Sequence, residues 1–171
     1  MKTTIIAIVG ASGSGKTALS AYLQKALGIP YLVSFTTRPM RNGELNGIDH
    51  YFVPIEEAPD PAETFAYTIF GGHHYWTNRE QIDKEEKISY VIDEKGLTDL
   101  WEKWGDTYNV ISVYVKRPNN PTDATRKSRD LDRIQIPEDK YDIVLVNDSS
   151  INDFFKQAIY KLAQYMDKIQ K

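Results

Sequence analysis

The stretch Gly10-Ala11-Ser12-Gly13-Ser14-Gly15-Lys16-Thr17 decides the fold of this chain. It fits the pattern GxxxxGK[ST] at every fixed position. The apolar run 5–9 before it predicts a buried strand, and residues 18–27 after it predict a helix that ends at Gly28. Strand, glycine-rich loop and helix in this order are the context of a phosphate-binding loop, so the sequence predicts a nucleotide site.

The residue types of the loop each have a chemical reason. Glycines let the backbone turn tightly, so that N–H groups converge on phosphate oxygens at a helix N-terminus, where the helix dipole favours anions. Lys16 adds a positive charge near the β- and γ-phosphates, and the Thr17 hydroxyl is a predicted ligand of Mg²⁺. The expected phosphate-binding residues are Gly10, Ser12, Gly13, Ser14, Gly15, Lys16 and Thr17. The alternative is a glycine-rich turn that only connects a strand to a helix.

The composition limits the possible partners. The chain has 171 residues, about the length of one domain, and 21 Lys and Arg against 24 Asp and Glu give a net charge of −3. No overall positive field therefore favours nucleic acid or a membrane surface. The absence of cysteine excludes disulfides and zinc–thiolate sites. With no leader pattern and no long apolar stretch, we expect a cytoplasmic protein that is a monomer or homodimer.

The remaining pattern alternates strands and helices. Predicted strands cover 31–35, 50–53, 64–70, 73–77, 88–92, 108–115 and 142–147, and predicted helices cover 78–86, 96–104 and a segment that starts at Ser150. This order predicts an α/β fold of the P-loop NTPase type, with a doubly wound, largely parallel sheet, helices on both faces and a small antiparallel insertion. We expect one domain over 1–171, with its core at about 1–33 and 88–171, an acceptor-binding insertion at about 34–87 and a lid at about 116–137.

A second stretch carries a resemblance to a known family. The segment 34–44, Ser-Phe-Thr-Thr-Arg-Pro-Met-Arg-Asn-Gly-Glu, with Gly47 and the strand 51–53, closely resembles the substrate segment of guanylate kinases. The likeness continues through Tyr75 and Thr77, through 93–96, and through 141–142 to 147–148. It covers most of the chain in the family's order.

The resemblance implies a transferase that moves the γ-phosphoryl group of Mg-ATP to a nucleoside monophosphate, with GMP or dGMP the leading acceptor. It implies that the acceptor phosphate is held by Arg38, Arg41, Tyr51 and Tyr75, and that the base edge is touched by Ser34 and Thr77. Asp93 would lie near Mg²⁺ and the ribose, Asn147 near adenine, and the lid arginines Arg126, Arg129 and Arg133 over the transferring phosphates. Catalysis would rest on Lys16, Arg38 and those lid arginines.

Three departures from the family pattern keep other interpretations open. Where guanylate kinases have a glutamate that pairs with guanine, this chain has Ala66 or Tyr67. Trp76 replaces a glycine, which would crowd or reshape the base pocket. The lid, 116–140, is compact. The alternatives are a kinase for a different phosphorylated acceptor and a non-catalytic binding module of the same fold. Asp93 could instead be a helix cap, and Arg38 and Arg41 could be ordinary surface charges.

Overall fold

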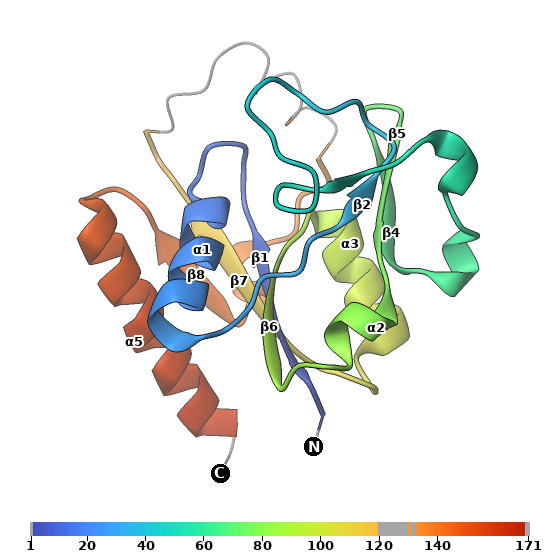
Figure 1. Ribbon diagram of the computed structural model, residues 1–171. Helices are drawn as coiled ribbons and strands as arrows, with labels where there is room; N and C mark the ends of the chain where they lie inside the picture. Colours follow the sequence, from blue (N-terminus) through green and yellow to red (C-terminus); the bar gives the residue numbers. More distant parts are fainter. Residues whose placement is uncertain (1, 120–129, 131–132, 170–171) are drawn as a thin grey trace.

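The computed structural model describes residues 2–119, 130 and 133–169. In this part of the chain the larger sheet has the order β6-β1-β7-β8, and every neighbouring pair in it is parallel (Figure 1). Its strands are β1 (Thr4–Val9), β6 (Lys87–Val91), β7 (Asn109–Lys116) and β8 (Ile143–Val146). The phosphate loop follows β1, a central strand, so it lies at the carboxyl edge of the sheet, where such folds bind ligands.

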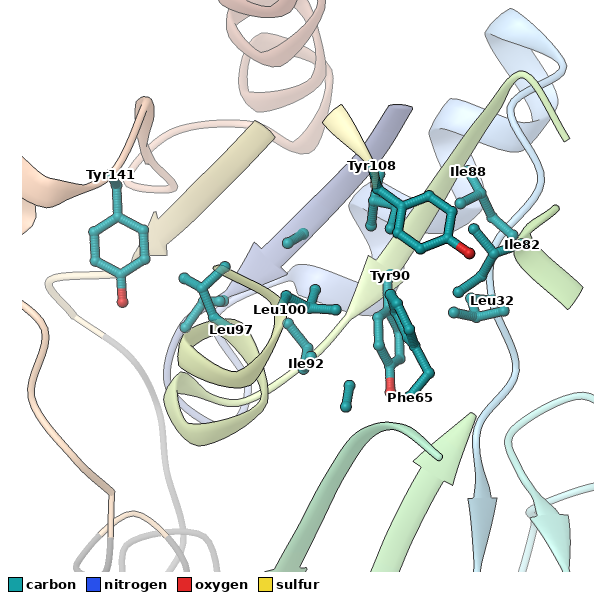
Figure 2. Packing of buried hydrophobic residues seen from close by; sticks show 14 residues of the cluster. Leu32, Phe65, Ile82, Ile88, Tyr90, Ile92, Leu97, Leu100, Tyr108 and Tyr141 are labelled. Carbon is teal, nitrogen blue, oxygen red and sulfur yellow. The ribbon is translucent and has the colours of Figure 1, made fainter. Parts of the chain in front are cut away.

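Both faces of this sheet are covered by helices, because β1 is apolar at every position from Ile5 to Val9. Its even positions pack with α1 (Lys16–Leu27) and α5 (Ile151–Ile169), on one side of the sheet. Its odd positions pack with α3 (Glu94–Asp99) and the π-helical turn η3 (Leu100–Trp104) (Figure 2). The predicted doubly wound α/β fold is confirmed.

A second sheet, with the order β3-β2-β5-β4, is built from the inserted segment (Figure 1). Its strands are β2 (Phe35–Thr36), β3 (Tyr51–Phe52), β4 (Phe65–Phe70) and β5 (His73–Thr77). The pairs β2–β5 and β4–β5 are antiparallel, as expected for the hairpin at Gly71 and Gly72, but β2 and β3 are parallel. The short helical turns η1 (Ile55–Glu57) and η2 (Pro61–Glu63) connect β3 to β4.

Several predicted element bounds were wrong. The strand expected at 31–35 is only an isolated bridge from Tyr31 to Ser89, and the chain then crosses to the second sheet as β2. The helix expected at 78–86 is the single turn α2 (Arg79–Ile82). The helix expected from Gly96 begins at Glu94, because the Asp93 side chain accepts a hydrogen bond from the Gly96 N–H at 2.7 Å.

The C-terminal elements follow their prediction closely. The turn η4 (Glu138–Lys140) leads into β8, and the Ser150 hydroxyl accepts a hydrogen bond from the Asp153 N–H at the start of α5. Phe154, Ala158 and Leu162 bury the apolar face of this helix. None of the helices in the described residues combines the length and apolarity of a membrane-crossing segment.

Candidate active site

The phosphate loop has the backbone that its glycines permit. Gly10, Gly13 and Gly15 all have positive φ, and α1 begins at Lys16. The Lys16 ammonium folds back and donates hydrogen bonds to the carbonyls of Gly10 and Ala11 at 2.7 and 2.8 Å. Burial, and next the Arg133 guanidinium, lower the pKa of Lys16 to about 8. A ligand phosphate would favour the charged form again.

Replacing Gly10 with alanine is expected to lower the free energy of unfolding by about 3 kcal/mol. A Cβ at this position, where φ is +154°, would lie 2.3 Å from the Val115 carbonyl oxygen, which belongs to the central strand β7. Gly28→Ala is the matched control, because φ there is +66° but nothing lies within 4 Å of the added Cβ. Urea denaturation should show that the free energy of unfolding falls by about 1 kcal/mol in the control. Equal losses in the two variants would contradict the steric explanation.

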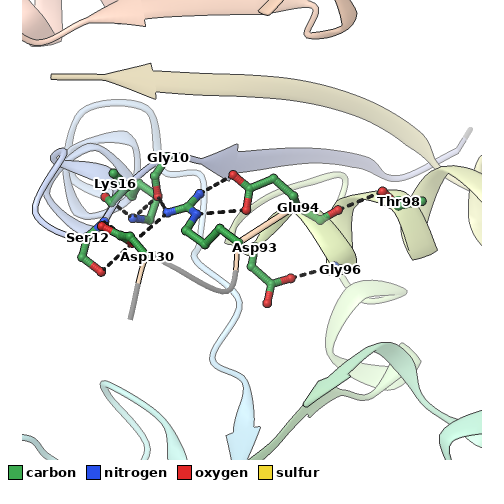
Figure 3. A network of polar contacts seen from close by, with 10 residues as sticks. Gly10, Ser12, Lys16, Asp93, Glu94, Gly96, Thr98 and Asp130 are labelled. Atoms are coloured by element: carbon green, nitrogen blue, oxygen red, sulfur yellow. Dashed lines mark hydrogen bonds and ion pairs between the residues drawn. The ribbon is translucent and has the colours of Figure 1, made fainter. Parts of the chain in front are cut away.

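A polar network lies against the loop (Figure 3). The Asp130 carboxylate accepts hydrogen bonds from the Ser12 N–H at 3.2 and 3.3 Å and from the Ser12 hydroxyl. Arg133 donates to both carboxylate oxygens of Glu94 and to the Gly10 carbonyl. The loop amide at Ser12 therefore already binds an anionic group, which is the chemistry expected of a phosphate site.

The Asn147 side chain contacts the backbone of the phosphate loop. Its side-chain amide donates to the Ser14 carbonyl at 2.8 Å, and only 9% of the residue is exposed. The structure therefore places Asn147 under the phosphate loop, where it holds the backbone in position. Ser14 is fully buried, and its hydroxyl has no hydrogen-bond partner among the described residues.

One cavity of about 270 Å³ joins this loop to the inserted segment. Its walls combine phosphate-loop residues with predicted acceptor ligands from the second sheet and its loops. Among the residues that line it are Gly10, Ser12, Lys16, Ser34, Arg38, Arg41, Tyr75, Asp93 and Arg133. The two halves of the predicted site, far apart in sequence, therefore face one space.

Arg38 is a buried, hydrogen-bonded cation of the acceptor side. It is 6% exposed, and its two terminal nitrogens donate to the two oxygens of Glu44 at 2.9 and 2.8 Å. Its guanidinium also lies over the Phe52 ring, 5.3 Å from the centroid. These contacts fix the orientation of Arg38 before any ligand arrives, so the alternative of a freely solvated surface charge does not apply to it.

Acid should weaken the Arg38–Glu44 pair. The hydrogen bonds from Arg38 lower the pKa of Glu44 to about 2, so its contribution to stability is complete above the unfolded pKa of about 4.3 and is lost as the pH falls toward 2. Glu44→Gln is therefore expected to cost about 2 kcal/mol at pH 6 and progressively less below pH 4. Unfolding free energies of both proteins between pH 2 and 6 test this, and a constant difference would contradict it.

Comparison with known proteins agrees with this geometry. The family model described as guanylate kinase matches residues 1–169. This chain belongs to the guanylate kinase family. Among its relatives, a guanylate kinase of Mycoplasma capricolum is 32% identical over 88% of this chain, and one of Lactobacillus acidophilus is 30% identical over 88%.

The relatives differ in how much of their own length this chain covers. It spans 58% of the Mycoplasma capricolum protein and 84% of the Lactobacillus acidophilus one. In fold it is similar to the crystal structure of guanylate kinase from Anaplasma phagocytophilum, with a TM-score of 0.66 at 23% identity, over 96% of this chain and 88% of that one.

The structure separates Ala66 from Tyr67, the two positions at which the resemblance places the base-reading glutamate. Ala66 lines the cavity, whereas Tyr67 bonds to His74 through its hydroxyl and faces the Trp76 ring. A bulge in β4 between Phe65 and Thr68, with φ of +52° at Ala66, explains why Ala66 lines the cavity and Tyr67 does not. At this position the cavity wall therefore has a methyl group, which cannot accept hydrogen bonds as the glutamate implied by the resemblance would.

Trp76 does not crowd the cavity, which was one of the two effects expected from the sequence. It is 3% exposed and stacks on Phe35, with ring centroids 5.6 Å apart, and it is not among the cavity residues. Successive side chains of a strand point to opposite faces, so Trp76 lies behind the sheet while its neighbour Tyr75 lines the cavity.

Other predicted site residues lie elsewhere. Thr77 is fully buried and donates to the Phe65 carbonyl at 3.1 Å. Tyr51 stacks on Phe35 with centroids 4.8 Å apart and does not line the cavity. Thr17 is exposed at the start of α1 and lines a neighbouring cavity of about 380 Å³. Arg126 and Arg129 lie outside the described residues, as does most of the predicted lid.

Asp93 has both of the properties considered from sequence. It caps α3, and it also lines the cavity. Burial raises the pKa of its carboxyl above the usual value. No cluster of three metal-ligating His, Asp or Glu side chains occurs among the described residues, so any Mg²⁺ here would depend on few protein ligands.

The residues of the site that sequence reasoning missed include Glu44, His50 and Asp130, which line the cavity, and Glu94, which binds Arg133. A signal existed for two of them: Glu44 belongs to the motif that carries Arg38, and Glu94 directly follows Asp93 at the end of a strand. Asp130 gave no signal, because it lies in a polar segment without periodicity. His50 adjoins Tyr51, and the family resemblance assigns the phosphate contact to the tyrosine.

Proposed function

We propose that this protein transfers the γ-phosphoryl group of Mg-ATP to the phosphate of a nucleoside monophosphate, with GMP or dGMP the leading acceptor. The observation that carries the proposal is the single cavity shared by Lys16, Arg38 and Arg41. A donor loop and a cationic acceptor site that open into one space are what in-line transfer between two anionic ligands requires.

The donor side fits the phosphates of ATP. Its loop amide at Ser12 already donates a hydrogen bond to a carboxylate, that of Asp130, and the Lys16 ammonium donates one to the Gly10 carbonyl in the same loop. Asp93, which lines this cavity, and Thr17, which lines the neighbouring one, would supply the carboxylate and hydroxyl oxygens that suit Mg²⁺, an ion that keeps most of its waters. When bound, Mg²⁺ would neutralise charge on the β- and γ-phosphates.

The acceptor side fits a phosphate dianion. Arg38 Nε is buried and has no hydrogen-bond partner among the described residues, so an incoming phosphate oxygen would satisfy it. Arg41 and Tyr75 line the same space. We treat 34–87 as the acceptor-binding insertion because it supplies these groups, and 1–33 with 88–171 as the core that supplies the donor loop.

The mechanism needs positioning and charge neutralisation more than proton transfer. The attacking acceptor oxygen is already anionic, so no general base is required. Arg38, fixed by Glu44, would orient the acceptor phosphate, while Lys16 and Arg133 face the cavity from the donor side and would stabilise the charge that passes between the two ligands.

ADP release from Mg-ATP tests the proposal when it is measured with a panel of ribo- and deoxynucleoside monophosphates. We expect turnover with GMP or dGMP at a rate well above that without acceptor. Equal, basal ADP release with every monophosphate would contradict the assignment and would favour a non-catalytic binding module of this fold.

A second function is favoured by one observation, the Ala66 methyl group at the base-reading position. A site that pairs with a base through hydrogen bonds rejects analogues by factors of about 10⁴, and a methyl group cannot supply that discrimination. The second candidate is therefore a kinase for a different phosphorylated acceptor. Turnover with another member of the panel, but not with GMP, would support it.

A further inference from the structure

His50 lies on the acceptor side of the cavity, in the place where the family resemblance put Tyr51. It lines the cavity, and Tyr51 does not. Backbone hydrogen bonds explain why His50 lines the cavity in place of Tyr51. The Tyr51 N–H donates to the Ser34 carbonyl at 2.9 Å, and the Phe52 N–H donates to the Asn46 side chain at 2.8 Å. These bonds fix the register of β3, and adjacent side chains then point to opposite faces.

The ring of His50 is held among the groups that would bind phosphate. Its Nδ1 lies 2.8 Å from the Ser34 hydroxyl. Its ring makes edge contacts with Phe52 and Tyr75, with ring centroids 5.7 and 5.8 Å away. The Arg38 guanidinium lies over the same Phe52 ring. Because Ser34 occupies Nδ1, Nε2 is the nitrogen that remains for a ligand.

We propose that the His50 imidazole, through Nε2, is a ligand of the acceptor phosphate. This inference rests on the proposed function, since it names a further residue of that acceptor site. The shared position beside Arg38 and Tyr75 favours the phosphate over the base. Unlike a tyrosine hydroxyl, an imidazole can gain a full positive charge at a pH near neutral.

The charges around His50 determine whether acceptor binding becomes stronger or weaker as the pH falls. Burial, and next the Arg38 cation, lower the pKa of His50, while Glu44, the Ser34 contact and Asp49 act in the opposite direction. His50 is therefore neutral in the free protein near pH 7. A phosphate dianion would offset the nearby cations and raise the pKa of His50, so that binding takes up a proton and the affinity for acceptor increases as the pH falls.

The test compares His50→Gln with wild type between pH 6 and 8, using both the KM for GMP and direct calorimetric binding of GMP. We expect the variant to raise the KM about tenfold at pH 6, with a smaller increase at pH 8 and little change in kcat. The acceptor phosphate itself titrates near pH 6, but it does so equally in both proteins. Only the difference between their profiles reports on His50.

Two further variants make the result specific. His50→Tyr keeps a hydrogen-bond donor that does not titrate in this range. At pH 8 it should bind GMP nearly as tightly as wild type does, but its affinity for GMP should not increase at pH 6 as that of wild type does. If His50→Gln does not fold, His50→Tyr still tests the role of His50. His73→Gln is the histidine control, because His73 lies at the start of β5 outside the cavity lining, and it should leave the profile unchanged.

The outcomes separate this inference from the proposed function. If the wild type binds GMP without turnover, the proposed function fails, and the calorimetric pH profile still decides the role of His50. If the wild type turns GMP over and His50→Gln has the same KM and pH profile, the role of His50 alone is overturned. A KM increase on Tyr51→Phe with none on His50→Gln would overturn it too, and absence of GMP binding by the wild type would overturn both.

Discussion

Lys16→Ala is expected to lower the rate of phosphoryl transfer by about 10³-fold while the protein remains folded. The ammonium is the cation at the base of the phosphate loop, and it is held there by the carbonyls of Gly10 and Ala11. Its lowered pKa means that the fold gains little from this charge, so its removal should affect activity much more than stability. Steady-state kinetics and thermal denaturation on the same preparations measure both quantities.

Lys25→Ala is the matched control for that experiment. Lys25 is an exposed residue in the last turn of the same helix, α1. Its replacement should leave kcat within about twofold of wild type, since exposed substitutions have small effects. Unchanged turnover in Lys16→Ala would refute the role given to this lysine and, with it, the donor site.

Arg38→Ala is expected to raise the KM for the acceptor about 10²-fold and to lower the free energy of unfolding by about 3 kcal/mol. The two effects have one cause, because Arg38 is both a predicted phosphate ligand and the buried partner of Glu44. Arg38→Lys should recover little of the affinity, since an ammonium cannot pair with the two carboxylate oxygens in the same way.

Arg79→Ala tests whether these effects belong to the cavity. Arg79 also has an aromatic contact, with its guanidinium 5.1 Å from the Trp104 centroid, but it does not line the cavity. Its replacement should leave the KM for the acceptor unchanged. Acceptor titrations at saturating Mg-ATP give both values, and a normal KM in Arg38→Ala would mean that the acceptor binds elsewhere.

The donor half of the site and the parallel sheet could be predicted from sequence because local patterns determine them. Glycine spacing specifies the loop, and continuous apolar runs such as 5–9 specify strands buried on both faces. The family pattern likewise identified Arg38, Arg41 and Tyr75 as members of one group, and all three line the cavity.

The rest depends on register and on distant partners. Whether His50 or Tyr51 faces the cavity follows from backbone bonds to Ser34 and Asn46, and a shift of one residue exchanges the two side chains. The bulge between Phe65 and Thr68 similarly decides that Ala66, and not Tyr67, lines the cavity. These contacts join residues that no local pattern connects.

The carboxylate of Asp130 on the Ser12 amide has a consequence for nucleotide affinity. An incoming triphosphate must exchange with an internal competitor that is tethered to the same chain and that dilution cannot remove. The observed dissociation constant is then the intrinsic one divided by the fraction of molecules in which Asp130 has left the loop. Such a protein binds nucleotide more weakly than one whose loop is vacant, since its own side chain occupies the Ser12 amide whenever no phosphate is bound.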